Sequence, residues 1–374
     1  MKIGIVGAGN IGTALAADIA RSHEVRLYSS KPKCFERDIL YIESTGSEKY
    51  SSQLYLVSDD YADVVNGADL IFVCLPTFLI RKASDSIAKN LKKNTPVCFV
   101  PGAGGIEFLS RSLVERGCPI AGLERVPYVA RLVEYGKCVS ASKKTKARIA
   151  FFRDETEGLF DMITEVLGMQ TTRMRGFISV SLTPTLHVSR LYDLYSEMGR
   201  VEYLDENPLF YGDWRDSASL ICLELDSELH QVCDALCKSG IDASELVPYT
   251  IHYESPTYYD LTAKLRSIKS LATIRGPVAK KDGKYILDVD SRYFTESFPF
   301  RLALVKGLAD IVGVSVPLSD KVLAWYAKIA NKNYYVKGDF IGKDVCECSC
   351  PQNFGIANLT DLVTYYSQKT KEGQ

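Results

Sequence analysis

Apolar residues over the first half of the chain fall into short runs that alternate with longer helical patterns. The runs predict strands at residues 1–6, 24–28, 53–57, 70–74, 97–100, 139–142 and 147–152, and the patterns between them predict helices at residues 13–20, 78–91 and 106–115. Apolar strands that alternate with helices are typical of a parallel sheet covered on both faces. We therefore predict an α/β domain, built on a doubly wound parallel sheet, over residues 1–176.

The pattern changes to long helical periodicities from residue 178 onward. Apolar positions recur at roughly 3.6-residue spacing at Cys222, Leu225, Leu229, Val232 and Leu236. Further helices are predicted at residues 258–270, 298–312 and 319–330, and a hairpin at residues 277–288 that turns at Lys281-Asp282-Gly283. These patterns predict a mainly α-helical second domain over residues 177–374, and we expect the substrate to bind between the two domains.

A glycine-rich turn joins the first predicted strand to the first predicted helix. It reads Gly7-Ala8-Gly9-Asn10-Ile11-Gly12, which is the G-x-G-x-x-G spacing of a dinucleotide-binding βα unit. Gly9 lets the backbone approach a pyrophosphate, and Gly12 lets the helix pack closely on the strand. The free N–H groups and the positive dipole end of the helix, which starts near Asn10 and Ile11, suit the phosphates. The first domain is therefore predicted to be of the Rossmann type and to bind a nicotinamide dinucleotide.

The end of the second predicted strand indicates which dinucleotide is bound. An acidic residue about 20 positions past the glycines would hold an adenine ribose 2′-hydroxyl. This chain has Ser29, Ser30, Lys31 and Lys33 in that region. Hydroxyls and cations suit a 2′-phosphate, which a carboxylate would repel. We therefore expect NADP rather than NAD, although an ordinary solvated loop would have the same composition.

Leu75 and Pro76 follow the strand predicted at residues 70–74. Open parallel sheets bind their ligands outside the carboxyl ends of the strands. We therefore add both residues to the predicted cofactor site.

Length, composition and net charge favour a globular protein of two domains that binds neither nucleic acid nor membranes. The 374 residues fit two domains, and the 46% apolar and 24% charged fractions are those of a soluble globular protein. A net charge of −1 gives no general attraction to nucleic acid or to anionic membranes, and no apolar run reaches the roughly 18 residues of a membrane span. Because the first strand is predicted to begin at Lys2 without a preceding signal segment, we expect a cytoplasmic protein.

We expect the eleven cysteines to be free thiols, including those that lie in two patterns similar to metal sites. An odd number of scattered cysteines fits a reducing compartment better than a disulfide scaffold. One pattern places His230, Cys233, Asp234 and Cys237 at helical spacings, and the other clusters cysteines at 346, 348 and 350. Neither has the paired C-x-x-C spacing of a zinc site, so we predict no bound metal.

Five ordered segments resemble the opine dehydrogenases of the octopine/nopaline dehydrogenase family. They are residues 99–105 (FVPGAGG), 125–137 (RVPYVARLVEYGK), 182–187 (LTPTLH), 291–296 (SRYFTE), and the tail pattern of residues 342–344, 354–356 and 359. The resemblance covers nearly the whole chain. Its specific parts are the segments that contain His187 and Arg292-Tyr293.

The resemblance implies a reductive condensation of an amino acid, or a related amine, with a 2-oxo acid. The amine and the carbonyl form an imine, and NAD(P)H delivers hydride to the imine carbon. His187 matches the family's catalytic histidine, and Arg292 its arginine near cofactor and substrate. Arg131 and Arg190 are further candidates for carboxylate contacts, with a structural salt bridge the better explanation for Arg190. A homodimer is left open.

One position departs from the family pattern. The aspartate expected to pair with the histidine is replaced by Ser297, which follows Glu296. A serine orients an imidazole by hydrogen bonding but does not stabilise imidazolium as a carboxylate does. Three explanations remain open: Glu296 supplies the carboxylate and is itself catalytic, His187 works with a weaker partner, or the protein has changed substrate or lost activity.

Two other functions compete with this prediction. A simple 2-oxo acid reductase resembling ketopantoate reductase would share the two-domain plan, but no residue here is identified as its catalytic lysine. A non-catalytic dinucleotide-binding sensor would explain the missing aspartate. Turnover that depends on both an amine and an oxo acid would distinguish the opine reaction from the simple reductase and from the sensor.

Overall fold

The computed structural model describes residues 1–153, 157–197 and 203–368. The chain divides into two compact units, one made of Met1–Ser181 together with the residues from Thr364 onward, and the other of Leu182–Val363. The division differs from the predicted boundary after residue 176 at two places. Helix α7 (Phe177–Ser181) is buried and contacts strands of the first unit, and the end of α15 (Leu359–Ser367) also belongs there.

The first unit is built on an eight-stranded sheet with the order β12-β11-β8-β7-β6-β1-β2-β5. Its strands are β1 (Lys2–Val6), β2 (Glu24–Tyr28), β5 (Leu56–Ser58), β6 (Leu70–Val73), β7 (Val97–Phe99), β8 (Ile120–Leu123), β11 (Lys146–Phe152) and β12 (Gln170–Arg173). Neighbours are parallel except β11 and β8. The strand order reverses at β1, which is where a doubly wound sheet binds its ligands. The predicted fold of this domain is confirmed.

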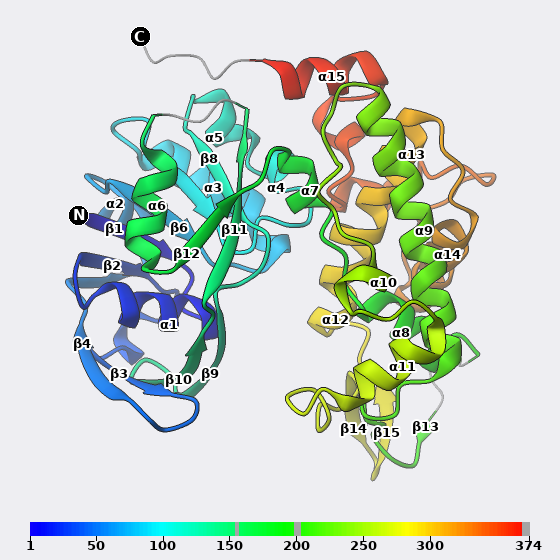
Figure 1. Cartoon of the computed structure of the whole chain (residues 1–374), viewed down its shortest axis with the longest axis horizontal. Helices are drawn as coiled ribbons and strands as arrows, with labels where there is room; N and C mark the ends of the chain where they lie inside the picture. The colour runs from blue at the N-terminus through cyan, green and yellow to red at the C-terminus, as the bar shows by residue number, and fades with distance from the viewer. Residues whose placement is uncertain (154–156, 198–202, 369–374) are drawn as a thin grey trace. The chain divides into compact units, whose positions relative to one another are not determined.

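The helices of this unit are α1 (Asn10–Ile19), α2 (Tyr61–Val65), α3 (Thr77–Asn90), α4 (Ile106–Leu109), α5 (Arg111–Glu115) and α6 (Leu159–Leu167) (Figure 1). Helices α1 and α3 lie close to the predicted positions, whereas α2 and α6 were not predicted. The single helix predicted over residues 106–115 is two helices, divided at Ser110, whose hydroxyl bonds to the Ile106 carbonyl at 2.7 Å. The strand predicted over residues 53–57 is wrong, because one strand ends at Gln53 and the next begins at Leu56.

A second, four-stranded sheet lies in the same unit and is not predicted by the apolar pattern. Its order is β4-β3-β10-β9, with β3 (Asp38–Glu43), β4 (Lys49–Gln53), β9 (Tyr128–Glu134) and β10 (Cys138–Lys143). The run at residues 139–142 belongs to this sheet rather than to the parallel one. Helix α1 packs on it, and Asp18 of α1 accepts hydrogen bonds from Tyr128 at 2.6 Å and Lys143 at 2.7 Å. The sheet therefore fixes α1 from the side opposite the main sheet.

The second unit is mainly helical, as predicted. Its helices are α8 (His187–Tyr195), α9 (Asp216–Lys238), α10 (Tyr249–His252), α11 (Tyr258–Ser267), α12 (Arg292–Ser297), α13 (Ala303–Val312), α14 (Pro317–Ala330) and the first part of α15. Helix α9 contacts α8, α11, α13 and α14, and its length is evident in Figure 1. None of the helices in the described ranges is both long and apolar enough to cross a membrane.

Two local features of this unit follow from single residues. The helix predicted over residues 298–312 starts with a π-helical turn, Phe298–Leu302, in which Pro299 has no N–H to donate. The hairpin forms where predicted, with β14 (Val278–Lys281) and β15 (Lys284–Leu287). Asp282 and Gly283 both have positive φ, 51° and 82°, as a two-residue hairpin turn requires.

Candidate active site and cofactor site

The glycine-rich turn lies between β1 and α1 and is shaped for close approach. Gly7 has a φ of 114°, and a Cβ there would lie 2.6 Å from the Cys74 carbonyl oxygen. A Cβ on Gly12 would lie 1.7 Å from the Gly7 carbonyl oxygen, so this glycine is required by the packing of helix on turn. A Cβ on Gly9 would meet no protein atom within 4 Å. Packing within the protein therefore does not require a glycine at position 9, whereas close approach of a pyrophosphate does.

No side chain caps the N-terminus of α1, so its first N–H groups are available to a ligand. Gly9 is its N-cap, and its first turn holds no acidic residue. Asn10 instead accepts a hydrogen bond from the Leu132 N–H at 2.9 Å, and Ile11 packs against the core. The positive end of the helix is not offset by a carboxylate, so these residues fit the phosphates of a dinucleotide.

The residues after β2 divide into one structural serine and an exposed pair. Ser29 is buried; its hydroxyl lies 3.0 Å from the Tyr135 hydroxyl and accepts from the Lys31 N–H at 3.1 Å. Ser30 and Lys31 are exposed at the strand end. The role of Tyr135 is not predictable from spacing, since it arrives from β9 and the turn that follows.

Leu75 and Pro76 lie at the carboxyl end of β6, which pairs with β1. The Leu75 side chain is a close neighbour of Gly7, because Cδ2 would lie 2.9 Å from a Cβ built there. Pro76 is the N-cap of α3. The structure therefore brings these two residues next to the glycine-rich turn, as predicted from the strand-end rule.

His187, the first residue of α8, lies beside the end of α12. Its Nδ1 is 3.2 Å from the Ser297 Oγ, and its ring centroid is 4.5 Å from that of Tyr293. The Phe210 ring stands edge-on at 5.9 Å. Tyr293 belongs to the Arg-Tyr segment quoted above, whereas Phe210 carries no sequence signal of its position.

Burial makes His187 a weak base. It lowers the pKa of His187 from 6.5 to about 4, with Glu296 acting against the shift and Arg301 and Arg292 adding to it. The imidazole is therefore neutral at neutral pH. The bond to the Ser297 hydroxyl orients the ring, and because a hydroxyl both donates and accepts, it suits either tautomer of the neutral imidazole.

Arg292 and Glu296 form an ion pair one turn apart on α12. The arginine Nη2 and Nε lie 2.8 and 3.2 Å from the same carboxylate oxygen, Oε2. The arginine side chain is 66% exposed and the glutamate 21%. The proposed catalytic residues thus gather around α12, and the arrangement matches the second explanation for Ser297, a histidine with a hydroxyl partner.

Comparison with known proteins matches the two halves of the chain to two different family models. Residues 173–330 match the family model of the NAD/NADP octopine/nopaline dehydrogenase α-helical domain. Opine dehydrogenase of Haliotis discus hannai is 27% identical over 86% of this chain and 84% of its own length. Tauropine dehydrogenase of Arabella iricolor is 26% identical over 96% and 99%.

Over nearly its whole length the chain resembles the opine dehydrogenases. A solved structure of octopine dehydrogenase with NADH and L-arginine has the same fold, with a TM-score of 0.85, 22% identity and full coverage of both chains. Residues 3–115 also match the model named ketopantoate reductase PanE/ApbA. That match is confined to the dinucleotide-binding unit, so it leaves the match of the helical unit unaffected.

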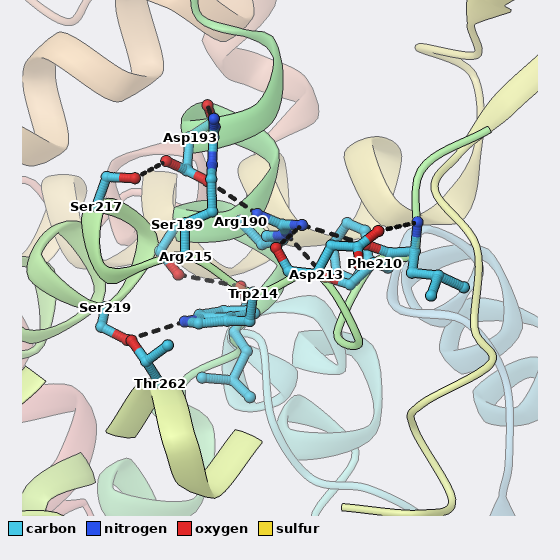
Figure 2. A network of polar contacts seen from close by, with 12 residues as sticks. Ser189, Arg190, Asp193, Phe210, Asp213, Trp214, Arg215, Ser217, Ser219 and Thr262 are labelled. Carbon is cyan, nitrogen blue, oxygen red and sulfur yellow. Dashed lines mark hydrogen bonds and ion pairs between the residues drawn. The ribbon is translucent and has the colours of Figure 1, made fainter. Parts of the chain in front are cut away.

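Arg190 is a structural residue (Figure 2). It is fully buried on α8 and donates to the Phe210 carbonyl at 2.7 Å and to the Asp213 carbonyl at 2.8 Å. Its Nη1 also lies 2.9 Å from the Asp193 carboxylate. With its guanidinium engaged on three sides, Arg190 is no candidate for a substrate carboxylate. Arg131, on β9, is exposed and donates to the Ala130 carbonyl.

The two metal-like patterns contain no metal site in the part of the chain that the structure describes. Within residues 1–153, 157–197 and 203–368, no three His, Cys, Asp or Glu side chains are placed to hold an ion together. The eleven cysteines are free thiols. His230 instead lies 3.7 Å from Asp226, one turn earlier on α9.

Proposed function

We propose that this protein condenses an amino acid, or a related amine, with a 2-oxo acid and reduces the resulting imine. The observation that carries the proposal is the contact between His187 Nδ1 and the Ser297 hydroxyl, on the helix that also holds the exposed Arg292. These residues lie in the part of the chain that matches the octopine/nopaline dehydrogenase model. In the first step the amine nitrogen attacks the carbonyl carbon and the oxygen leaves as water. The bound dinucleotide supplies the hydride that reduces the carbon–nitrogen double bond.

His187 serves as the acid and base of the first step. As a neutral imidazole it takes a proton from the ammonium form of the amino acid, which frees the nitrogen lone pair for attack. His187 then delivers that proton to the former carbonyl oxygen, which takes a second proton from the nitrogen and leaves as water; the protonated imine that remains would accept the hydride. Ser297 holds Nδ1 and so directs Nε2 toward the reacting groups. An anionic substrate beside the ring raises the pKa of His187 above its value in the free protein, which favours the proton-carrying form when it is needed.

Arg292 holds the carboxylate of the oxo acid. An arginine fork matches a carboxylate geometrically, and this one is already paired with Glu296 through both Nε and Nη2. Its exposure allows the partner to be exchanged or shared. Glu296 contributes as the charge that keeps Arg292 in place and that favours a protonated His187.

The cofactor is a nicotinamide dinucleotide, and we propose that it is NADP. Gly7, Gly9, Asn10, Ile11 and Gly12 would hold its pyrophosphate. Leu75 and Pro76 would line the adjoining strand end, and Ser30 and Lys31 with the turn serine Ser29 would surround a 2′-phosphate. We also propose a cytoplasmic location, because the eleven thiols are free.

The test is NADPH oxidation across a matrix of amino acids and 2-oxo acids, with NADH in parallel and each substrate omitted in turn. Turnover that requires both an amine and an oxo acid is expected and would identify the substrates. Turnover with an oxo acid alone would indicate the ketopantoate-reductase-like reaction instead. Binding of NADPH without turnover for any pair would favour the sensor.

A further inference from the structure

Glu107 is a fully buried carboxylate that the proposed reaction does not use. It lies on α4, directly after the FVPGAGG segment of residues 99–105. Oε2 accepts a hydrogen bond from the Ser181 hydroxyl at 2.8 Å, and Oε1 accepts one from the Tyr366 hydroxyl at 2.6 Å. The neighbouring Tyr365 hydroxyl donates to the Glu107 carbonyl oxygen at 2.7 Å.

The two hydroxyls come from the two places where the chain passes between the units. Ser181 is the last residue of the first unit before the chain enters the second, and Thr364 is the first residue after it returns. Tyr366 is the third residue after the second connection, and Ser181 lies directly before the first. One carboxylate holds both connections on the side of the dinucleotide-binding unit.

The glycine segment before Glu107 forms the rest of this anchor. The Gly104 N–H donates to the Ser181 carbonyl at 2.8 Å, and the Gly105 N–H donates to the Ser181 hydroxyl at 3.0 Å. A Cβ on Gly102 would lie 2.9 Å from the Val180 side chain, so the segment packs directly on the end of α7. The motif that supported the family resemblance thus has a physical role here, which is to receive Ser181.

Aromatic packing fixes the returning chain in the same place. The Tyr365 ring stacks on Phe108 at 5.6 Å, and the Tyr366 ring meets Phe152 edge-on at 5.4 Å. Arg153 donates to the Tyr365 carbonyl at 3.1 Å. The end of α15 is therefore held by its main chain, its rings and its hydroxyls.

A carboxylate suits this position because its two oxygens receive two separate hydroxyls at once. Burial raises the pKa of Glu107 to about 7, and the bonds from Tyr366 and Ser181 act against the rise. Burying a carboxylate costs desolvation free energy, and the hydrogen bonds from Ser181 and Tyr366 offset part of that cost.

We propose that Glu107 is a positioning residue: it fixes both connections between the units and so sets where the segment of residues 182–186, which leads directly to His187, leaves the dinucleotide-binding unit. The consequence for catalysis rests on the proposed function. The anchor itself can be tested without turnover.

Hydrogen–deuterium exchange of the full-length protein at pH 8 tests the anchor. In Glu107→Gln only one oxygen remains to accept, so we expect the four amides of residues 182–186, where Pro184 has none, to exchange at least tenfold faster than in wild type. Tyr366→Phe keeps the ring and removes one hydroxyl, and we expect the same amides to exchange at least threefold faster than in wild type. The matched control is Tyr365→Phe, which loses a bond to the Glu107 main chain only and should stay within twofold at residues 182–186. The amides of β1 should be unchanged in all three.

Unchanged exchange at residues 182–186 in Glu107→Gln and Tyr366→Phe would overturn the proposal. Equal acceleration in β1 would also overturn it, because the effect would then be a general loss of stability. Should Glu107→Gln fail to fold, Tyr366→Phe against Tyr365→Phe decides the question. If the exchange changes as expected while wild type turns over no substrate pair, the anchor is supported and the proposed function fails. With an active substrate pair, we expect Glu107→Gln to lower kcat while the KM for NADPH stays within twofold.

Discussion

Two arginines of the helical unit, Arg190 and Arg292, show how the same side chain serves two purposes. Arg190 is fully buried, and carbonyl oxygens and the Asp193 carboxylate occupy its guanidinium. Arg292 is 66% exposed and held by the carboxylate of Glu296. A guanidinium surrounded by fixed main-chain acceptors has no way to exchange partners, whereas one held by a single side chain at the surface does. The local sequence pattern does not distinguish them, since both lie near aromatic residues in helical segments, whereas the family resemblance, which implies a place near cofactor and substrate for Arg292 only, does.

Replacing Arg190 should give the largest loss of stability. Arg190→Met leaves the Asp193 carboxylate, which is 3% exposed, without its buried partner, and we expect the free energy of unfolding to fall by about 3–5 kcal/mol. Arg215→Met is the matched control, because Arg215 pairs with the same carboxylate (Figure 2) and its side chain is 52% exposed. Its loss should cost less than about 1 kcal/mol in urea titrations. Equal losses would show that burial does not separate the two arginines.

Replacing Arg292 should affect catalysis rather than stability. For Arg292→Ala we expect kcat/KM for the oxo acid to fall roughly 100-fold, because a charge-assisted contact to the carboxylate is lost. The unfolding free energy should change by less than about 1 kcal/mol, as for other exposed ion pairs. Arg292→Lys keeps the charge without the fork and should recover part of the rate. A variant as active as wild type would remove Arg292 from the substrate site.

Replacing Ser297 should change the pH dependence. In Ser297→Asp a carboxylate faces Nδ1, so the pKa of His187 should rise from about 4 and the acid limb of kcat/KM should move to higher pH. In wild type the lowered pKa means that the unfolded chain binds more protons between pH 6.5 and 4, so stability is lost as pH falls through that window. Ser297→Asp should reduce this loss of stability at low pH, because its carboxylate favours a protonated His187, whereas Ser297→Ala should not reduce it. A pH profile that does not move would exclude Ser297 as the partner of the catalytic group.

The smallest effect is expected at the turn after β2. Removing the two exposed lysines in Lys31→Ala/Lys33→Ala should raise the KM for NADPH about fivefold, which corresponds to about 1 kcal/mol, while the KM for NADH stays within twofold. Lys281→Ala, an exposed lysine of the hairpin, is the control. Equal changes for both dinucleotides would argue against recognition of a 2′-phosphate.

The sequence was sufficient for the central strands of the main sheet and for the helical unit, because their signals are local, but β8 and β12 at one side of the sheet were missed. Strand β1 and its glycine turn form one continuous pattern, and the helices of the second unit carry regular apolar spacing. The meeting of His187 with Ser297 followed from the family resemblance, and the structure agrees with it at 3.2 Å.

The four-stranded sheet was missed because its strands bury only one face and pair over long distances. Strand β4 reads Lys-Tyr-Ser-Ser-Gln, which is too polar to distinguish from a loop, and β3 pairs with β10 nearly a hundred positions away. The partners of Glu107 were equally hidden. A glutamate on a short helix gives no sign that its acceptors will be used by Ser181 and Tyr366.

The most direct test of the account is turnover by wild type and His187→Asn with an amino acid and a 2-oxo acid supplied together, alongside NADPH binding by fluorescence. Wild type should oxidise NADPH only when both substrates are present. His187→Asn should bind NADPH within twofold of wild type but lose about a thousandfold in kcat, the scale of general acid–base catalysis. Full activity in His187→Asn, or turnover by wild type without the amine, would contradict the account.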